Sequence, residues 1–490
     1  MKPSGQQVSL QIASLCSIFI YSKIAGEIIS GLNIKSFFDN YLFILSCPRD
    51  QDGFMRLGSH LLISALILAV LLSGCTEKAE NEKKAVTEGA AGSANASASA
   101  ESAAAEGQGS VKIGALQSLT GDLASYGGPM SDAIKLAAKQ INENGGLLGK
   151  KLELLVEDDQ TNNVAAVDAA NKLVKVDRVP AIVGDTGSGQ SMSIIDITTA
   201  NGVLQISSSN TGTEFTTYKD NDLYFRTAPS DTLQGSAMAN LAKQRGYKTV
   251  STIVINNPYG VGFEEVFVKA FEANGGKVLE KIRYDPSQSI FDSEVQKIAA
   301  SKPDFVMMVS YPETGSLILR TAYEKGALTD APWLLSEGLK VDNIAELAGK
   351  NAKGEYIIAG LQGLAPDQNA GGKAYEAFRD LFKAEYGKEP GVYCSNSYDA
   401  VALVALAIEQ AKSATGRSIA DNLRSVANPP GVEVSDLKEA LKLVREGKDI
   451  NYQGASGDIS FDENGDVSGS YNVWTIAQNG SFIQGEMIAA

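Results

Sequence analysis

The sequence is poor in the residues on which much enzyme chemistry depends. It has one histidine, His60, and four cysteines, Cys16, Cys47, Cys75 and Cys394. A mature chain beginning at Cys75 has no imidazole and no Cys-rich cluster. This excludes Ser–His and Cys–His nucleophile pairs, His-ligated metals and Cys-rich zinc sites. We therefore predict a binding protein and not an enzyme, with no metal, no cofactor and no internal disulfide.

Positive charge is also in deficit. The 490 residues contain 43 Lys and Arg against 58 Asp and Glu, a net charge of −15. Nucleic-acid binding needs clustered Lys and Arg to meet phosphates, so the composition argues against a nucleic-acid partner. The length predicts two or more domain-sized units.

The amino-terminal part carries a targeting signal. Residues 61–72, LLISALILAVLL, are too few to span a bilayer comfortably and fit the apolar region of a signal peptide. They run into Leu72-Ser73-Gly74-Cys75, which resembles the lipobox of bacterial lipoproteins. The resemblance implies cleavage before Cys75 and lipid attachment to its sulfur; an uncut signal anchor is the alternative.

The segments on either side of this signal are expected to carry no core. Met55-Arg56 offers a start and a positive charge, so we assign 55–74 to the signal peptide and 1–54 to a spurious upstream extension. An unusually long leader is the other interpretation. Residues 75–110, the lipidated Cys followed by an Ala/Ser/Glu/Gly-rich stretch, predict a flexible linker.

From residue 111 onward, short apolar runs alternate with amphipathic segments. VKIGALQ at 111–117 predicts a strand, and Met130, Ile134, Ala138 and Ile141 then recur at helical spacing. Similar pairs continue to PWLLSE at 332–337. Near-continuous apolar strands followed by helices imply parallel sheets buried on both faces. About 380 residues of such units exceed one open sheet, so an α/β fold with two doubly wound lobes is expected.

Several stretches, taken in order, resemble one family. LTGDLASYGGPMSDAIKLAAKQINENGGLLGKKLELLVEDDQ at 119–160 looks like the first βαβ unit of periplasmic branched-chain amino-acid-binding proteins, the type I solute-binding proteins of ABC transporters. The likeness continues through IVGDTGSGQS, NNPYGVGFEEVF, LLSEGL and GDISFDENGDVSG and covers nearly all of 111–485. The resemblance implies two lobes joined by three hinge crossings, near 226–229, 356–361 and 459–467. Lobe I then comprises 111–228 and 360–462, and lobe II 229–359 and 463–490.

A free amino acid sets physical demands on such a cleft. Its carboxylate and ammonium both lose water on closure, so each needs hydrogen bonds and an opposite charge or dipole. Hydroxyl groups and the N–H groups of a helix N-terminus suit the carboxylate. A carboxylate with aromatic support suits the ammonium.

The family resemblance places these groups in this sequence. It implies that Ser188 and Thr211 bind the ligand carboxylate, and that Ser209 offers a backbone carbonyl to the ammonium. Glu337 matches the acidic partner of the ammonium, and the remaining ligand-contacting positions are Tyr311, Tyr126, Tyr259 and Thr186. Ordinary roles compete with each: a helix cap for Ser188, turns for Ser209 and Thr211, a solvated loop for Glu337, and packing for the tyrosines.

The expected side-chain pocket departs from the pattern of leucine, isoleucine and valine binders. Thr186 and Gly187 stand where those proteins have apolar residues, and Asn210 stands at a small apolar position. An unpaired polar lining disfavours an aliphatic ligand. We therefore expect a pocket more polar than usual.

Three classes of function remain open. The first is a monomeric, lipid-anchored receptor that captures an amino acid outside the cytoplasm, at the membrane or facing the periplasm. It would deliver the ligand to an ABC permease and its ATPases. The second is an amino-acid or amide sensor without a transport role. The third is an enzyme using carboxylates alone, with VEDD at 156–159 and Glu337 as the acids.

Overall fold

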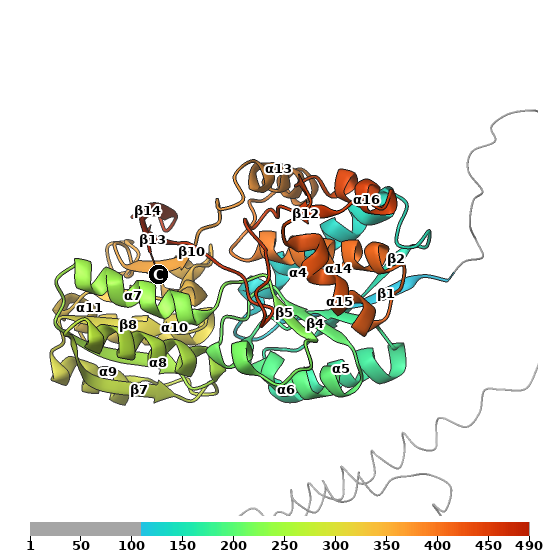
Figure 1. The fold of residues 1–490 in the computed structure, drawn as a ribbon. Coiled ribbons are helices and arrows are strands. Elements are labelled where there is room, and N and C mark those ends of the chain that lie inside the picture. The colour runs from blue at the N-terminus through green and yellow to red at the C-terminus, as the bar shows by residue number, and fades with distance from the viewer. Residues whose placement is uncertain (1–108, 490) are drawn as a thin grey trace, which may run out of the picture. The chain divides into compact units, whose positions relative to one another are not determined.

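The computed structural model describes residues 109–489. The signal peptide, Cys75 and the expected extension and linker up to residue 108 lie outside this part of the chain. Within 109–489, no helix combines the length and apolar character needed to cross a membrane. Two large β-sheets organise the described chain, one in each lobe (Figure 1).

The first sheet is wholly parallel, in the order β2-β1-β3-β4-β5. Neighbouring side chains of its strands enter different cores: Ala115 joins one apolar cluster and Leu116 another. Alternation of this kind puts apolar residues on both faces, so both faces must be covered by helices. The strands are β1 Val111–Gln117, β2 Leu152–Asp158, β3 Ala181–Val183, β4 Leu204–Ser207 and β5 Tyr224–Arg226.

Helices cover both faces of this sheet. Figure 1 shows α5 and α6 on one face and α14 and α15 on the other. The helix α14 is buried along nearly its whole length, so it is a core helix of this lobe. The helices are α4 Ala124–Glu143, α5 Asn163–Asn171 with a π-helical continuation Lys172–Asp177, α6 Ser188–Ala200, α13 Lys373–Tyr386, α14 Cys394–Ala411, α15 Gly416–Ala427 and α16 Leu437–Arg445. A small two-stranded sheet, β11 Val432–Val434 and β12 Ile450–Tyr452, belongs to the same lobe.

The second sheet has the order β14-β13-β10-β9-β8-β6-β7. The five neighbouring strands β10, β9, β8, β6 and β7 run parallel, whereas β13 pairs antiparallel with β10 and with β14. A tight turn at Gly480 joins β13 to β14, and such a short connection forces an antiparallel pair. The strands are β6 Thr249–Ile255, β7 Lys277–Tyr284, β8 Phe305–Val309, β9 Trp333–Leu335, β10 Gln362–Pro366, β13 Tyr471–Ile476 and β14 Phe482–Ile488.

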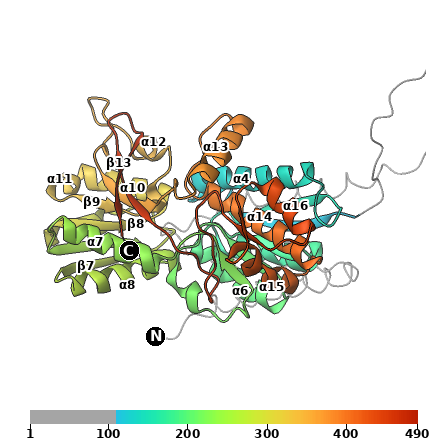
Figure 2. The same ribbon diagram turned by 45° about the horizontal axis from the view of Figure 1, so that its top comes forward.

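Helices also pack against both faces of the second sheet, with α7 beside α8 and α10 beside α9 (Figure 1) and with α12 next to α10 (Figure 2). The doubly wound α/β class is therefore confirmed for this lobe too, with the antiparallel edge as an addition to the expectation. The helices are α7 Asp231–Gln244, α8 Pro258–Ala273, α9 Asp292–Ser301, α10 Pro312–Glu324, α11 Ala327–Asp330 and α12 Ile344–Ala348.

The chain crosses from one lobe to the other at three points, where successive elements belong to different lobes. Figure 2 shows α13 to α16 beside α4 and α6 of the first lobe, while β13 lies among the elements of the second. The changes fall between β5 and α7, between β10 and α13, and between β12 and β13. The second change follows residue 366, later than the crossing expected at 356–361. The segment 362–366 is a strand paired with β9 and β13, so it belongs to lobe II and not to the lobe I segment that begins at 360.

Candidate functional site

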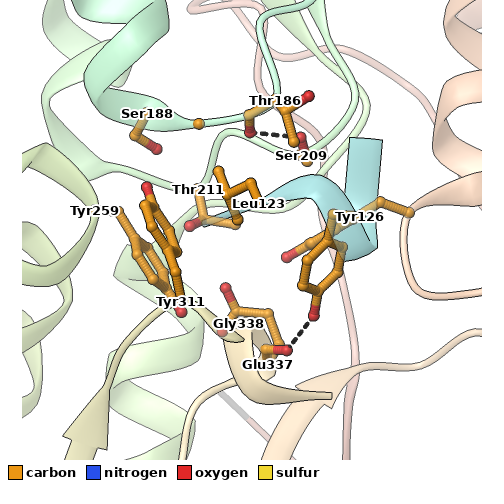
Figure 3. Close-up of a pocket in the computed structure, with 12 residues that line it drawn as sticks. Leu123, Tyr126, Thr186, Ser188, Ser209, Thr211, Tyr259, Tyr311, Glu337 and Gly338 are labelled. Atoms are coloured by element: carbon orange, nitrogen blue, oxygen red, sulfur yellow. Dashed lines mark hydrogen bonds between the residues drawn. The ribbon is translucent and has the colours of Figure 1, made fainter. Parts of the chain in front are cut away.

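A pocket lies where the two lobes meet, and all eight expected ligand-contacting residues line it (Figure 3). The empty space in the pocket, counted together with the solvent open to it, is about 330 Å³. Of the charged side chains, only that of Glu337 is in the lining. The lining residues are Leu123, Tyr126, Thr186, Gly187, Ser188, Ser209, Thr211, Tyr259, Tyr311, Glu337, Gly338 and Tyr393.

The N-terminus of α6 forms one wall of the pocket. Ser188 is its first residue and is buried, and no side chain caps the helix at Gly187. Uncapped first-turn N–H groups and the helix dipole together favour an anion at this end. The Ser188 Oγ accepts a hydrogen bond from the Gly212 N–H at 3.3 Å, so its own proton stays available for a ligand.

The loop after β4 brings Ser209 and Thr211 to the same wall. The Arg226 guanidinium donates to the carbonyl oxygens of Asn210 at 3.3 Å and Gly212 at 2.7 Å, which holds the loop on both sides of Thr211. Arg226 is fully buried and forms a two-point ion pair with Asp466, at 2.6 and 2.8 Å. Its charge is therefore already balanced by that carboxylate.

Glu337 forms the opposite wall, from lobe II. It begins a short 3-10 turn, Glu337–Leu339, directly after β9. Its carboxylate accepts a hydrogen bond from Gln234 Nε2 at 2.7 Å, and none of the ion pairs within 109–489 includes it. Burial without a cation raises the pKa of Glu337 to about 7. An ammonium group placed in the pocket would supply the missing positive charge.

Two tyrosines from lobe II form a rigid aromatic wall. The rings of Tyr259 and Tyr311 stack with centroids 5.7 Å apart and planes 3° from parallel. The Tyr259 hydroxyl donates to Ser336 Oγ at 2.8 Å, and the Tyr311 hydroxyl accepts from Asn257 Nδ2 at 3.1 Å. Both rings are therefore fixed at both ends, and Figure 3 shows them side by side at the edge of the pocket.

Apolar and aromatic groups from lobe I complete the enclosure. Leu123 and Tyr126, at the start of α4, line the pocket with Tyr393, whose ring centroid lies 6.2 Å from that of Tyr126. Tyr393 has φ +67°, a left-handed conformation that is uncommon for a bulky residue. Such strain persists where the surroundings demand one side-chain position, and sites that bind ligands are where it gathers.

The expected polar lining is not available to a ligand, because protein partners already engage it. Asn210 does not line the pocket; its amide donates to the carbonyls of Asp185 and Thr186 and accepts from the Tyr224 hydroxyl. The Thr186 hydroxyl accepts from the Ser118 N–H at 3.0 Å and donates to Gln117 at 3.2 Å. The sequence could not reveal this, since all these partners are set by the fold and not by local pattern. The expectation of an unusually polar pocket assumed that Thr186 and Asn210 present free polar groups to the ligand, and that assumption was wrong.

Several hydrogen bonds join the lobes around the pocket. Asp122 of lobe I accepts from the Glu313 and Thr314 N–H groups, at 2.7 and 3.0 Å, and thus caps α10 of lobe II. It also accepts from the Thr314 hydroxyl at 2.8 Å. The Tyr126 hydroxyl donates to the backbone carbonyl of Glu337. These contacts exist only while the lobes are together, so they stabilise the closed form.

Asp231 and Gln234 were missed by sequence reasoning. They lie one turn apart on α7, and Asp231 has no solvent exposure. An acidic residue in the first turn of a helix is an ordinary capping signal, so nothing local singled it out. In the structure Ser230 caps the helix instead, which leaves the Asp231 carboxyl group facing inward.

The acids proposed for a carboxylate-only enzyme do not meet at the pocket. Asp158 accepts from the Leu119 and Thr120 N–H groups and ties down a loop. Asp159 accepts from the Ser118 hydroxyl, and neither acid lines the pocket with Glu337. Glu337 therefore has no partner among them for general acid–base work.

Comparison with known proteins agrees with this geometry. Residues 110–471 match the family model described as periplasmic binding protein. A leucine-, isoleucine-, valine-, threonine- and alanine-binding protein of Pseudomonas aeruginosa is 30% identical over 361 residues, covering 73% of this chain and 87% of the relative. A chemotactic signal-transduction substrate-binding protein, BasB, of Halobacterium salinarum is 25% identical, covering 71% and 83%.

A solved structure shows the same fold. The leucine-binding protein LivK of Thermotoga maritima is 26% identical, with a TM-score of 0.66 over 77% of this chain and 99% of that one. The chain is thus a two-lobed solute-binding protein. It belongs to the type I periplasmic branched-chain amino-acid-binding protein family, whose members are solute-binding proteins and not enzymes.

Proposed function

We propose that this protein captures a free α-amino acid between its two lobes and delivers it to an ABC permease with its ATPases. One observation carries the proposal: Ser188 at an uncapped helix N-terminus and Glu337 without a cation line the same pocket from opposite lobes. A zwitterion has its two charges a few bonds apart, so it satisfies both walls at once. Closure is favoured because the ligand then contacts both lobes.

Each of the eight expected ligand-contacting residues has a proposed role. The carboxylate of the ligand lies at the first turn of α6, with hydroxyl donors from Ser188 and Thr211. Its ammonium lies between the Glu337 carboxylate and the backbone carbonyl of Ser209. The lining supplies no cation to hold the carboxylate, so the helix N-terminus does that work. Tyr126, Tyr259 and Tyr311 cover the ligand, and Thr186 contributes to the wall with its hydroxyl engaged elsewhere.

The side chain of the ligand is proposed to be aliphatic. Leu123 and the four tyrosine rings provide apolar surface, while the polar groups of Thr186 and Asn210 are hydrogen-bonded within the protein. An aliphatic side chain therefore leaves no buried polar group unpaired. The names of the relatives point the same way, since they include leucine, isoleucine and valine binders.

The same proposal includes the location of the protein. A lipid on Cys75, left after removal of the signal peptide 55–74, would hold the lobes near the permease outside the cytoplasm. The linker 75–110 would give them reach, and the monomer would be the working unit. Mass spectrometry of membrane-extracted protein is expected to find a diacylglycerol-modified Cys75 as the first residue; an unmodified chain beginning upstream would contradict the lipoprotein assignment.

The binding proposal is tested by thermal shift and calorimetry with single amino acids. L-Leucine, L-isoleucine and L-valine are expected to raise the melting temperature, since a ligand at a hundred times its Kd adds about 2.7 kcal/mol of stability. Ser188→Ala should weaken binding by about tenfold through loss of a charge-assisted hydrogen bond. Ser193→Ala, on the outer part of α6, is the matched control and should bind normally. No shift with any amino acid would refute the proposal.

A sensing role is the second candidate, and the relative named for chemotactic signal transduction favours it. Both roles use the same ligand pocket, so binding data do not separate them. Deletion of the gene does: loss of amino-acid uptake with normal taxis supports transport, and loss of taxis with normal uptake supports sensing.

A further inference from the structure

A buried carboxyl group without any hydrogen-bond partner lies beside the ligand pocket. Both carboxyl oxygens of Asp231 are inaccessible to solvent and lack a partner within hydrogen-bond geometry, as does the neighbouring Gln234 Oε1. Buried polar groups in native proteins are almost always paired, and an unpaired one costs about 1–3 kcal/mol. Such a cluster of acceptors without donors needs an explanation.

Asp231 and Glu337 belong to one electrostatic cluster. The Glu337 charge is, after burial itself, the main cause that raises the pKa of the Asp231 carboxyl group, and the nearby Thr211 hydroxyl and Arg226 oppose this rise only in part. Gln234 lies one turn after Asp231 on α7, is buried like it, and donates to the Glu337 carboxylate at 2.7 Å. Two buried carboxyl groups that repel each other cannot both ionise at low cost.

Within residues 109–489, no cation is free to neutralise the pair. Arg226 acts on Asp231 from a distance, but its three nitrogens are engaged by Asp466, Thr216 and the carbonyls of Asn210 and Gly212. Lys340 donates instead to Gln368 at 3.3 Å. The other titratable groups that face the pair are Tyr126 of α4, Tyr259 of α8, Tyr393 before α14, Tyr471 of β13 and Tyr311 before α10, all neutral phenols at physiological pH.

We propose that Asp231 and Glu337 act as one acid pair, which holds a proton in the ligand-free cleft and releases it to solvent when the ammonium group of a ligand enters. The proposal rests on the proposed function and deepens it. The charge balances: the ligand brings one positive charge, and the pair becomes one unit more negative as its proton leaves. Glu337 contacts the ammonium. Asp231 is a positioning residue that does not contact the ligand and acts through its charge repulsion with Glu337.

This pair makes the site selective for a cationic group. If the pair gives up its proton, a ligand with a neutral nitrogen or with a carboxylate alone leaves an uncompensated buried charge. Such ligands must bind to the protonated pair and therefore release no proton. Amino acids are distinguished from amides and simple organic acids by this proton exchange.

Calorimetry with L-leucine as the probe tests the proposal. Titrations in two buffers of different ionisation enthalpy count the protons released, from about pH 6 to about pH 8.5. We expect release of about one proton per L-leucine throughout this range, and a Kd that therefore improves about tenfold per pH unit across it. 4-Methylpentanoate, which is leucine without its amino group, should release none.

The alkaline end of this titration separates the pair from Glu337 alone. A lone Glu337 with a pKa of about 7 is ionised at about pH 8.5 and has no proton left to release. Continued release there requires the second carboxyl group, so binding of L-leucine without proton release at about pH 8.5 would overturn the proposal. This measurement uses the wild-type protein and does not depend on the folding of a variant.

Variants give a second test. Asp231→Asn keeps the shape and should abolish release at about pH 8.5 and flatten the pH dependence of Kd. Asp399→Asn is the matched control, because Asp399 is a buried acid of lobe I outside the pocket, hydrogen-bonded to Ser456; it should release protons like wild type. Full release by Asp231→Asn would refute the role of Asp231. Failure of every amino acid to bind would instead refute the proposed function, and the acid pair with it.

Discussion

Replacement of Glu337 by Gln is expected to stabilise the ligand-free protein and weaken ligand binding. Glu337 is 3% exposed and has no cation partner, and its burial moves the pKa of the carboxyl from 4.5 to about 7. A raised pKa means that the folded state favours the protonated acid. The contribution of the protonated Glu337 to the stability of the folded protein is complete below about pH 4.5, and it is lost as the pH rises through about 7. Above about pH 8, the ionised form therefore costs the folded ligand-free protein about 3 kcal/mol.

The amide introduced by Glu337→Gln carries no charge at any pH, so this penalty disappears. The free energy of unfolding of the variant at about pH 8 should exceed that of wild type by about 1–3 kcal/mol, allowing for imperfect hydrogen bonding of the new amide. At about pH 5 the two proteins should be nearly equal. Binding moves in the opposite direction: loss of one partner from a buried charge pair costs about 3–5 kcal/mol, which raises the Kd for L-leucine by roughly 10²–10⁴.

Urea unfolding at both pH values and calorimetry with L-leucine measure these effects. Glu264→Gln is the matched control, because Glu264 is equally buried but is paired with Arg283 at 2.7 Å and with Lys281 at 3.8 Å. That variant should lose stability at about pH 8 and keep its affinity. If Glu337→Gln were destabilised at about pH 8 and still bound L-leucine like wild type, the reasoning about an uncompensated carboxylate would be wrong.

Three further outcomes are expected. Asp122→Ala removes the cap that lobe I provides for α10, so L-leucine should dissociate faster and the Kd should rise roughly tenfold in stopped-flow and calorimetric assays; an unchanged dissociation rate would contradict the role of this contact in closure. Arg226→Met leaves Asp466 without its cation in a buried pair, and should lower the free energy of unfolding by about 3–5 kcal/mol in urea; a loss smaller than about 1 kcal/mol, on the order of a surface pair, would be inconsistent with this pairing. Burial raises the pKa of the Cys394 thiol to about 12, so iodoacetamide should label it only in unfolded protein, and rapid labelling of the native chain would show that α14 opens.

Local pattern was enough to predict most of the elements. The strand expected at 111–117 is β1 Val111–Gln117, and the helical spacing from Met130 to Ile141 falls within α4 Ala124–Glu143. These predictions succeed because a parallel sheet buried on both faces demands continuous apolar strands, and because chain-breaking residues bound each element. The hinge positions were harder to predict from the sequence. The segment QGLAP at 362–366 carries no local signal of the sheet that it joins, and only its pairing with β9 and β13 assigns it to lobe II.

The residues of the pocket could be predicted from the resemblance to a family, but not from the chemistry of the residues themselves. Ser188 and Glu337 lie far apart in the chain and carry ordinary local signals, a helix start and a loop acid. Their meeting in one pocket depends on the packing of two sheets, which no local pattern encodes. The roles of these residues as ligand contacts stay predictions until binding is measured.

The sequence by itself determined the fold class of the molecule: a chain built from apolar strands and amphipathic helices folds into doubly wound lobes. Only the tertiary structure decided which polar groups are free. Thr186 and Asn210 proved to be engaged by other parts of the protein, whereas Asp231, an ordinary first-turn acid by its position, proved to be buried without a partner. The reason is physical: a hydrogen bond depends on the distance between atoms, and sequence pattern fixes that distance only for near neighbours along the chain.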